Sequence, residues 1–332
     1  MWYTNFGPSG DIVLSSRVRL ARNISKIPFG NKMSDADLEK IESICKDALP
    51  ELKFIDLSKM SVFERLALKE NHLISPEMAD EKKSGSILVN DDCTLSILIG
   101  EEDHLRIQAM DSGLSLEKCM QLANQIDDRL DKKADFAFSD ELGYLTCCPS
   151  NTGTGLRASV MMHLPALTQT CKMESIIRSL SKLGIAVRGI YGEGSTALAN
   201  IYQISNQVTL GISEEDSLSR LSQIVDDIIA KERSISLEIY QANKFRLEDK
   251  ILRSKGILQN ARIITSGEAL SLISDVRWGI NLGIIKDINH EQLLSALYES
   301  FPATIAKNHN TSSPLERDLK RGEIFQKVLK SN

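Results

Sequence analysis

The sequence lacks the marks by which several common classes of protein are recognised. Its six cysteines show no framework spacing and its five histidines form no HxxxH pair, so we expect reduced thiols and no protein-built zinc site. No apolar run approaches the roughly 18 residues that a membrane span needs. The first residues also lack the basic and apolar regions of a secretory signal, and we therefore expect a cytoplasmic protein.

The sequence also lacks an excess of positive charge. Its formal net charge is −5, which argues against a general nucleic-acid binder. Any binding of anions must then depend on a local cluster of positive side chains. The remaining composition, 42% apolar and 26% charged over 332 residues, is that of an ordinary globular protein of about two domains.

Short apolar runs with strand character dominate the middle of the chain. Several lie only a few residues apart, which is too close for a helical crossover between parallel strands. We therefore predict an α+β fold with a largely antiparallel sheet flanked by helices. The predicted strands cover residues 87–89, 95–100, 104–110, 158–164, 185–190 and 201–211.

Helical patterns lie before, between and after these strands. From about Ser213 onward the pattern is almost entirely helical. The chain is thus predicted to contain a mixed domain over residues 1–233 and an all-helical domain over residues 234–332. The helices predicted in the mixed domain, each with apolar residues on one face, cover 34–48, 61–70 and 115–130.

Two short segments combine charges in a way that suggests phosphate chemistry. In SSRVRLAR at 15–22, an extended backbone places Arg17 and Arg19 on the same side, about 6.5–7 Å apart by strand rise. Two such planar guanidinium groups can bind the oxygens of a polyphosphate. In EEDHLR at 101–106, an acidic triplet precedes Arg106. A solvated basic strand and an ion pair between Glu102 and Arg106 are the plain alternatives.

Two further segments carry an arginine beside glycines. CCPSNTGTGLRAS at 147–159 ends near Arg157 and superficially matches a dinucleotide fingerprint, but an apolar stretch with a proline follows instead of a helix, which argues against a Rossmann fold. In RGIYGEGS at 188–195, Arg188 ends a strand and Glu193 lies in a glycine-flanked loop, although a plain turn would look the same. No Walker A, HRD or DFG motif is present, which excludes the common kinase routes. Jointly, the four segments predict a site for a highly charged phosphate donor and a cationic or proton-bearing acceptor.

In their order along the chain and in their residue patterns, the four segments resemble motifs of the phosphagen kinases, the ATP:guanidino phosphotransferases. They most closely resemble those of the bacterial protein-arginine kinase branch. The resemblance covers roughly residues 10–235 and implies an antiparallel sheet ringed by helices. It implies ATP as phosphate donor, with Mg²⁺ held mainly by phosphates and water rather than by a protein cage. It assigns five residues to the phosphates of ATP: Arg17, Arg19, Arg106, Arg157 and Arg188.

The same resemblance assigns residues to the acceptor. Glu102 and Glu193 would hold the guanidinium group, and Cys148 would lie against one of its nitrogens, where a thiolate would add negative charge. A small buried hydrophobe is the alternative for Cys148. Either glutamate could receive the proton, and Glu102 is our choice for the base. Met161 stands where animal members usually carry a histidine near the adenine, and His163 could compensate.

The resemblance further bears on the acceptor's size. Kinases of small guanidines carry a helical domain before the SSRVR segment. Here that segment begins at Ser15, which leaves no room for such a domain. An open acceptor cleft suits an arginine presented on another protein.

In the protein-arginine kinase branch, a C-terminal RDxxRA motif binds phosphoarginine. The corresponding RDLKRG here contains Arg317, Asp318 and Arg321, with Gly322 in place of the alanine.

The partners implied by the resemblance are protein substrates that present arginine, a Clp-type chaperone-protease of the bacterial stress response, and a zinc-binding activator. A homodimer through the helical domain is implied as well, without direct contact to nucleic acid or membrane. Two other functions remain open at this point. One is a kinase of free arginine or another small guanidino compound, and the other is a non-catalytic adaptor that binds phosphoarginine.

Overall fold

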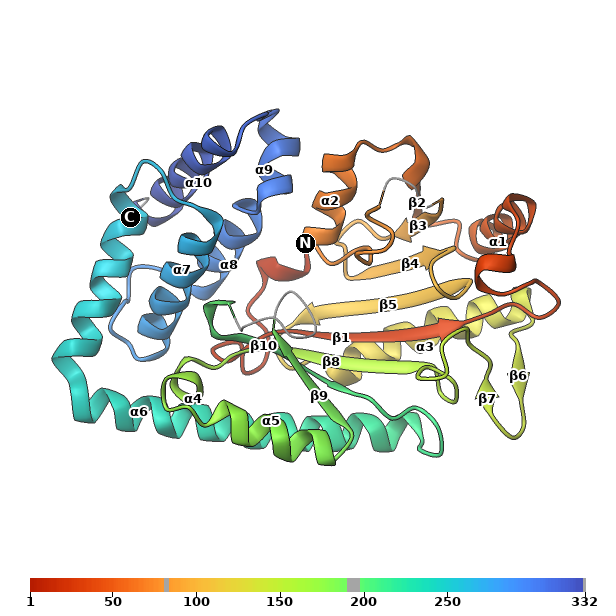
Figure 1. Ribbon diagram of the computed structural model, residues 1–332, viewed down its shortest axis with the longest axis horizontal. Coiled ribbons are helices and arrows are strands. Elements are labelled where there is room, and N and C mark those ends of the chain that lie inside the picture. Colours follow the sequence, from red (N-terminus) through yellow and green to blue (C-terminus); the bar gives the residue numbers. More distant parts are fainter. Residues whose placement is uncertain (81–83, 190–197, 331–332) are drawn as a thin grey trace.

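A fully antiparallel sheet of eight strands forms the centre of the molecule (Figure 1). The computed structural model describes residues 1–80, 84–189 and 198–330. The strand order is β2-β3-β4-β5-β1-β8-β10-β9, which confirms the predicted α+β class with an antiparallel sheet flanked by helices. The strands are β1 (Val13–Arg22), β2 (Lys53–Asp56), β3 (Ser86–Val89), β4 (Leu95–Ile99), β5 (Leu105–Ser112), β8 (Leu156–His163), β9 (Ile185–Gly189) and β10 (Ile201–Asn206). A separate small hairpin joins β6 (Phe138–Ser139) to β7 (Gly143–Tyr144).

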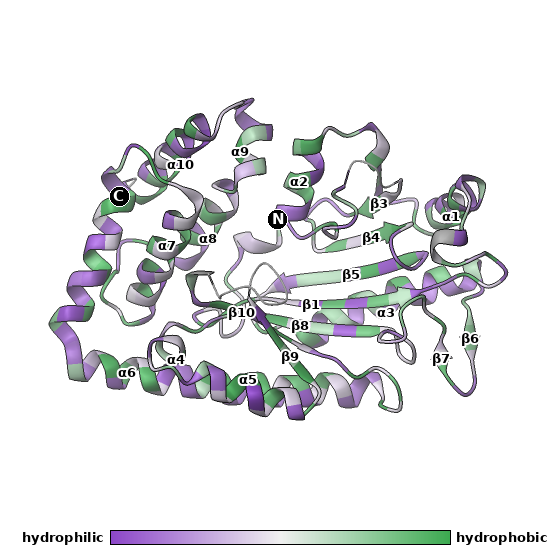
Figure 2. Cartoon of the chain, viewed as in Figure 1, coloured by the Kyte–Doolittle hydropathy of each residue, from purple (hydrophilic) through white to green (hydrophobic). Residues whose placement is uncertain are grey.

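The central strand β1 separates an apolar face from a charged face. Val18 and Leu20 are fully buried on the face of the sheet that packs against α3 (Leu116–Ala134). Because side chains alternate along a strand, Arg17 and Arg19 lie on the opposite face. Figure 2 shows hydrophilic bands that interrupt the mostly hydrophobic central strands. The sheet therefore presents a charged surface on the side away from its main core.

Helices cover the apolar face and continue into a helical C-terminal region. Ser34 and Ser61 form capping boxes at the starts of the first two helices, where the sequence predicts them. The helices α4 and α5 and the strand β2 were not predicted. The helices are α1 (Asp35–Ala48), α2 (Val62–Glu70), α3 (Leu116–Ala134), α4 (Pro165–Gln169), α5 (Met173–Lys182), α6 (Glu214–Asn260), α7 (Ser266–Asn281), α8 (His290–Glu299), α9 (Pro302–His309) and α10 (Pro314–Leu329). Short 3₁₀ turns occur at η1 (Trp2–Thr4), η2 (Gly30–Lys32), η3 (Leu57–Lys59) and η4 (Leu198–Asn200).

The long helix α6 connects the sheet to the helical region. It packs against β8 and β10 of the sheet and against α7 of the helical region. The helix bends at Asn243, whose φ of −136° and ψ of 38° are not helical. The predicted domain boundary at residues 233/234 thus lies within one helix, and independent folding of the two parts stays a prediction. Among the described residues, no helix combines the length and apolarity that crossing a membrane requires.

The helical region returns to the sheet beside α2. The Glu70 carboxylate accepts the backbone N–H groups of Ala303 (2.8 Å) and Thr304 (2.7 Å), and thereby caps the N-terminus of α9. Close by, the rings of Tyr3 and Tyr298 stack with centroids 4.4 Å apart. Figure 1 shows α9 next to α2 at this junction. These contacts place the C-terminal helices at one end of the charged face of the sheet.

Candidate active site

A cavity of about 1310 Å³ lies over the charged face of the sheet. Its walls come from the central strands, from α2 and the segment that follows it, from the segment around Cys147, and from the start of α9 together with α10. A cavity of this size, lined by convergent charged groups, is large enough for a nucleotide and part of a second substrate. It is the main candidate for a functional site.

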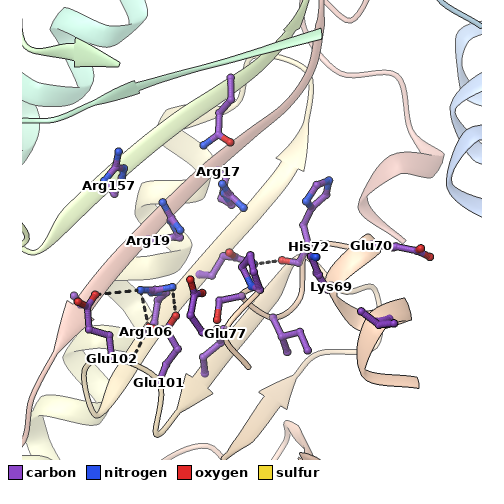
Figure 3. A pocket seen from close by; sticks show the side chains of 18 of the residues that line it. Arg17, Arg19, Lys69, Glu70, His72, Glu77, Glu101, Glu102, Arg106 and Arg157 are labelled. Atoms are coloured by element: carbon purple, nitrogen blue, oxygen red, sulfur yellow. Dashed lines mark hydrogen bonds and ion pairs between the residues drawn. The ribbon is translucent and has the colours of Figure 1, made fainter. Parts of the chain in front are cut away.

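The cavity brings together all five arginines that the sequence predicts for phosphate binding. Arg17 and Arg19 extend from β1, and Arg157 of β8 lies directly opposite Arg19 in the antiparallel register. Arg106 comes from the neighbouring strand β5, and Arg188 from β9. Figure 3 shows four of these side chains along one wall. Strands that are far apart in the sequence thus supply one cluster of positive charge.

The cluster is electrostatically costly without a ligand. Burial, followed by the charges of Arg106 and Arg157, lowers the pKa of Arg17 to about 10. Burial and the neighbouring arginines also lower the pKa of Arg19 well below its usual value. Among the described residues, the Nε atom of Arg19 has no hydrogen-bond partner. Because guanidinium groups stay charged at neutral pH, a bound polyanion would relieve this repulsion.

Two adjacent glutamates in the loop before β5 differ in their surroundings. Glu101 forms a bidentate ion pair with Arg106 at 2.7 and 2.6 Å and is almost fully buried. Glu102 approaches Arg106 only to 3.9 Å, and its side chain is 46% exposed. The ion pair considered for Glu102 is therefore made chiefly by Glu101, whose role the sequence did not reveal. Glu102 stays available to a ligand in the cavity (Figure 3).

The environment of Glu102 favours proton uptake. Burial raises the pKa of Glu102, the nearby Asp103 and Glu101 raise it further, and Arg106 opposes the shift. A carboxylate whose pKa is raised in this way is a better proton acceptor than an ordinary surface glutamate. The geometry and the charges together identify Glu102 as a candidate base.

The loop that carries Glu102 is fixed from two sides. The Asp103 carboxylate accepts hydrogen bonds from the Asn23 amide (2.7 Å) and the Cys147 backbone N–H (2.7 Å). His104 Nδ1 accepts the N–H of Ile24 (2.9 Å). Because burial lowers the pKa of His104, its ring is neutral and one nitrogen can accept. The end of β1, the Glu102 loop and the Cys147 segment are therefore held in one fixed arrangement.

The two neighbouring cysteines do not occupy equivalent places. Cys147 lines the cavity, but burial raises the pKa of its thiol to about 12, which disfavours a thiolate. Cys148 is half-buried, its Sγ lies 3.0 Å from Ser150 Oγ, and it is not among the residues that form the cavity wall. Its contact with an acceptor stays a prediction. Glu193, the second predicted carboxylate, lies outside the described residues.

The end of the cavity next to the helical region has a different character. Met161 lines it as expected, together with His72, which the sequence analysis missed. Burial and the charge of Arg17 lower the pKa of His72 to about 3, so the ring is neutral. His163 is fully buried and lies 2.8 Å from Ser274 Oγ, away from the cavity, so the compensating role suggested for it is wrong. His163 lies two residues after Met161 on β8, as the sequence shows, but α7 covers that part of the strand.

The RDLKRG motif of α10 is only partly accessible. Arg317 lines the cavity. Arg321 is buried, donates to the carbonyls of Ser300 (2.9 Å) and Ile264 (2.8 Å), and pairs with Asp318. A Cβ atom at Gly322 would lie 2.6 Å from the Arg262 carbonyl oxygen, so the alanine of the related motif would require the backbone here to shift. Of the three residues predicted to bind phosphoarginine, Arg317 alone joins the candidate site.

Comparisons with known families cover most of the chain. The family described as ATP:guanido phosphotransferase, C-terminal catalytic domain, matches residues 37–235. The family described as the Protein-arginine kinase McsB C-terminal domain matches residues 244–332. Their limits lie on either side of the bend in α6 at Asn243.

Two relatives named protein-arginine kinase match over most of their own length. The "Protein-arginine kinase" of Bacillus pumilus is 45% identical, with 99% of this chain and 93% of that protein covered. The protein of the same name from Desulforamulus reducens is 40% identical, with 99% and 95% covered. Among solved structures, lombricine kinase has a TM-score of 0.60 and 28% identity, with 69% of this chain and 68% of that chain covered. The duplicated taurocyamine kinase from Schistosoma mansoni has a TM-score of 0.60 and 26% identity, with 80% and 42% covered.

Proposed function

The chain belongs to the ATP:guanido phosphotransferase family, in its protein-arginine kinase branch, and we propose that it transfers the γ-phosphate of ATP to arginine side chains of proteins. One observation carries this proposal: five arginines and the carboxylate of Glu102 line a single cavity. The arginines match a polyphosphate, and the carboxylate matches a cationic acceptor. Relatives named protein-arginine kinase agree with the chain over almost its full length.

The arginines bind and orient ATP. Phosphoryl transfer through a loose transition state demands mainly alignment and charge compensation. Arg17 and Arg19 on one strand, with Arg157 opposite Arg19, can hold the phosphate oxygens from one side. Arg106 can reach the transferred group because it lies beside Glu102. The groups are already in place before the ligand binds, so little reorganisation is required during the reaction.

Mg²⁺ enters this scheme together with ATP. When bound, it supplies positive charge that offsets the phosphates. Carboxylate oxygens are ligands that Mg²⁺ prefers, often through water, and Glu77 and Glu101 both line the cavity. Glu101 is engaged by Arg106, whereas Glu77 forms no ion pair with another described residue. We therefore expect phosphates and water to hold most of the ion's coordination sphere, with Glu77 at its edge.

Glu102 acts on the acceptor. A guanidinium has a pKa above about 12 and a delocalised lone pair, so it is a poor nucleophile until it loses a proton. Glu102 can pair with its N–H groups, keep the attacking nitrogen in line with the γ-phosphorus, and take up the proton. A nitrogen–phosphorus bond forms as the bond from the γ-phosphorus to the bridging oxygen breaks, and ADP leaves. From its place in the motif, Glu193 would supply the second carboxylate.

Arg317 supports a link between the C-terminal region and phosphorylated protein. We propose that Arg317 makes the phosphate contact of the RDLKRG motif, while Arg321 and Asp318 hold α10 in position through their buried bonds.

Exposed apolar side chains along α6, with Phe245 82% and Leu237 55% exposed, support dimerisation of the helical region. A Clp-type protease, a zinc-binding activator and a cytoplasmic location stay predictions.

A competition experiment tests the choice of acceptor. The protein is incubated with labelled ATP, an unfolded protein and free arginine together, and acid-labile label is measured on each acceptor. We expect the label on the protein. Label only on free arginine would instead favour a kinase of small guanidines, and label on neither would favour a non-catalytic adaptor.

A further inference from the structure

Tyr298 of α8 connects the helical region to the nucleotide end of the cavity. Its hydroxyl oxygen lies 3.1 Å from Nε2 of His72, which lines the cavity. The two residues are 226 positions apart in the sequence and belong to different parts of the fold. This bond is the only hydrogen bond that the Tyr298 hydroxyl makes within the described part of the chain.

The backbone of His72 is held in an uncommon conformation. Its φ of +61° lies in the left-handed region, which non-glycine residues rarely adopt. The His72 carbonyl accepts the Gln108 side chain from β5 (2.6 Å), and the His72 N–H donates to the Lys69 carbonyl (2.9 Å). These bonds fix where the side chain begins but leave the ring orientation to its other neighbours. A strained residue at a cavity wall is a reason to look for function.

The direction of the bond follows from the state of each ring. Burial raises the pKa of the Tyr298 phenol, so the group keeps its proton, and this proton has a partner among the described residues only if the hydroxyl donates to His72. The lowered pKa of His72 keeps the imidazole neutral, so one nitrogen accepts and the other carries the hydrogen. Because Nε2 accepts from Tyr298, Nδ1 carries the hydrogen. The contact therefore selects one tautomer of His72.

Tyr298 can impose this state because it is itself rigidly packed. Its ring stacks on Tyr3 with an interplanar angle of 7° and meets Trp2 edge-on at 5.1 Å. The ring of Phe301 also meets it edge-on, with the ring centroids 5.3 Å apart. The nearby cap of α9 by Glu70 fixes the same junction a second time.

The position of His72 relates it to ATP. The γ-phosphate must lie beside Glu102, where the acceptor nitrogen attacks, so the rest of ATP extends along the cavity away from Glu102. Figure 3 shows Arg17 between Arg19 and His72, with His72 toward the end opposite Glu102. The ribose and base, which carry hydrogen-bond acceptors, would then lie near the imidazole.

We propose that Tyr298 is a positioning residue of the active site, which orients His72 so that the Nδ1–H group of the ring is presented to the nucleoside part of ATP. The helical C-terminal region is thus part of the nucleotide site rather than an appended module. The inference rests on the proposed use of ATP. It predicts that loss of the hydroxyl weakens ATP binding but leaves the chemical step unchanged.

The test compares Tyr298→Phe with Tyr240→Phe. The first change removes the hydroxyl and keeps the packed ring. The matched control removes the hydroxyl that donates to Glu248 (2.8 Å) in α6, away from the cavity. Nitrogen NMR of labelled histidine reports the tautomer, and the presence of only five histidines makes assignment through a His72→Gln variant practical. Calorimetry gives the Kd for ATP, and steady-state kinetics give kcat and KM.

We expect Nδ1–H in the wild type and the control, and a mixture of tautomers in Tyr298→Phe. The Kd and KM for ATP should rise about threefold to tenfold in Tyr298→Phe, as for loss of one hydrogen bond, with kcat at saturating ATP unchanged. An Nε2–H tautomer in the wild type, or an unchanged tautomer and Kd in Tyr298→Phe, would overturn the proposal while leaving the kinase function intact. A wild-type protein that does not bind ATP would instead contradict the proposed function.

Discussion

Arg19 of β1 and Arg157 of β8 occupy directly opposed positions in an antiparallel ladder, and both line the same cavity. Like charges facing each other across two strands destabilise a sheet. The arrangement is therefore understandable only if a ligand of opposite charge completes it. Stability without ligand and affinity for ATP are expected to oppose each other at these positions.

Replacing Arg19 by methionine tests this opposition. Arg19→Met should raise the free energy of unfolding of the ligand-free protein by about 0.2 to 1 kcal/mol, because cross-strand repulsion is removed. The same variant should no longer gain stability from ATP. Thermal unfolding with and without ATP measures both effects. Arg129→Met is the control: it breaks an exposed ion pair with Glu51 and should leave the response to ATP as in the wild type. Full stabilisation of Arg19→Met by ATP would exclude Arg19 from the phosphate site.

The neighbours Glu101 and Glu102 should respond differently to the same substitution. Glu102→Gln should lower kcat by about 10² to 10⁴, the range of a lost general base, with little change in the Kd for ATP. Glu101→Gln weakens the bidentate pair that holds Arg106, so kcat and ATP affinity should both fall. Single-turnover kinetics and calorimetry separate the two cases. Unchanged turnover in Glu102→Gln would refute its role as the base.

The pH dependence of kcat/KM follows from the pKa shift of Glu102. The pKa is raised, so the carboxyl keeps its proton at a higher pH than an ordinary glutamate and cannot accept another. Activity should therefore fall as the pH decreases through this raised value. We expect the acidic limb of the profile to have a midpoint above the usual value of 4.5, and to be absent from the residual activity of Glu102→Gln. A midpoint at or below 4.5 would contradict the assignment.

Arg188 on β9 provides a test of the phosphate clamp. Arg188→Ala should lower the rate of transfer by roughly 10³ or more, the size expected for an arginine that stabilises the transferring phosphoryl group. Arg178→Ala, on the exposed face of α5, controls for loss of one positive charge nearby in the sequence. The rate of acid-labile phosphate formation is the measurement. A loss of less than about tenfold would assign Arg188 a structural role only.

The sequence predicted those parts of the site that depend on local periodicity. Alternation along a strand is enough to place Arg17 and Arg19 on one face, and the short connections are enough to predict an antiparallel sheet. Capping residues such as Ser34 and Ser61 mark where helices begin. These features arise within a few residues, where the sequence is most informative.

The features that the sequence did not predict arise from tertiary contacts. Glu101 and Glu102 are identical in type and adjacent, and only the fold decides that Arg106 pairs with the first. His72 lines the cavity and its ring is bonded to Tyr298, 226 residues away, a contact that only the tertiary fold creates. Arg321 is buried against the carbonyls of Ser300 and Ile264, which its motif could not indicate.

The most direct test of the central claim is mass spectrometry of an unfolded client protein incubated with ATP, under mild conditions that preserve a phosphorus–nitrogen bond. We predict phosphate on arginine side chains with the wild-type protein and none above background with Glu102→Gln. Phosphate only on serine, threonine or tyrosine, or no ATP-dependent modification of the client at all, would contradict the assignment as a protein-arginine kinase.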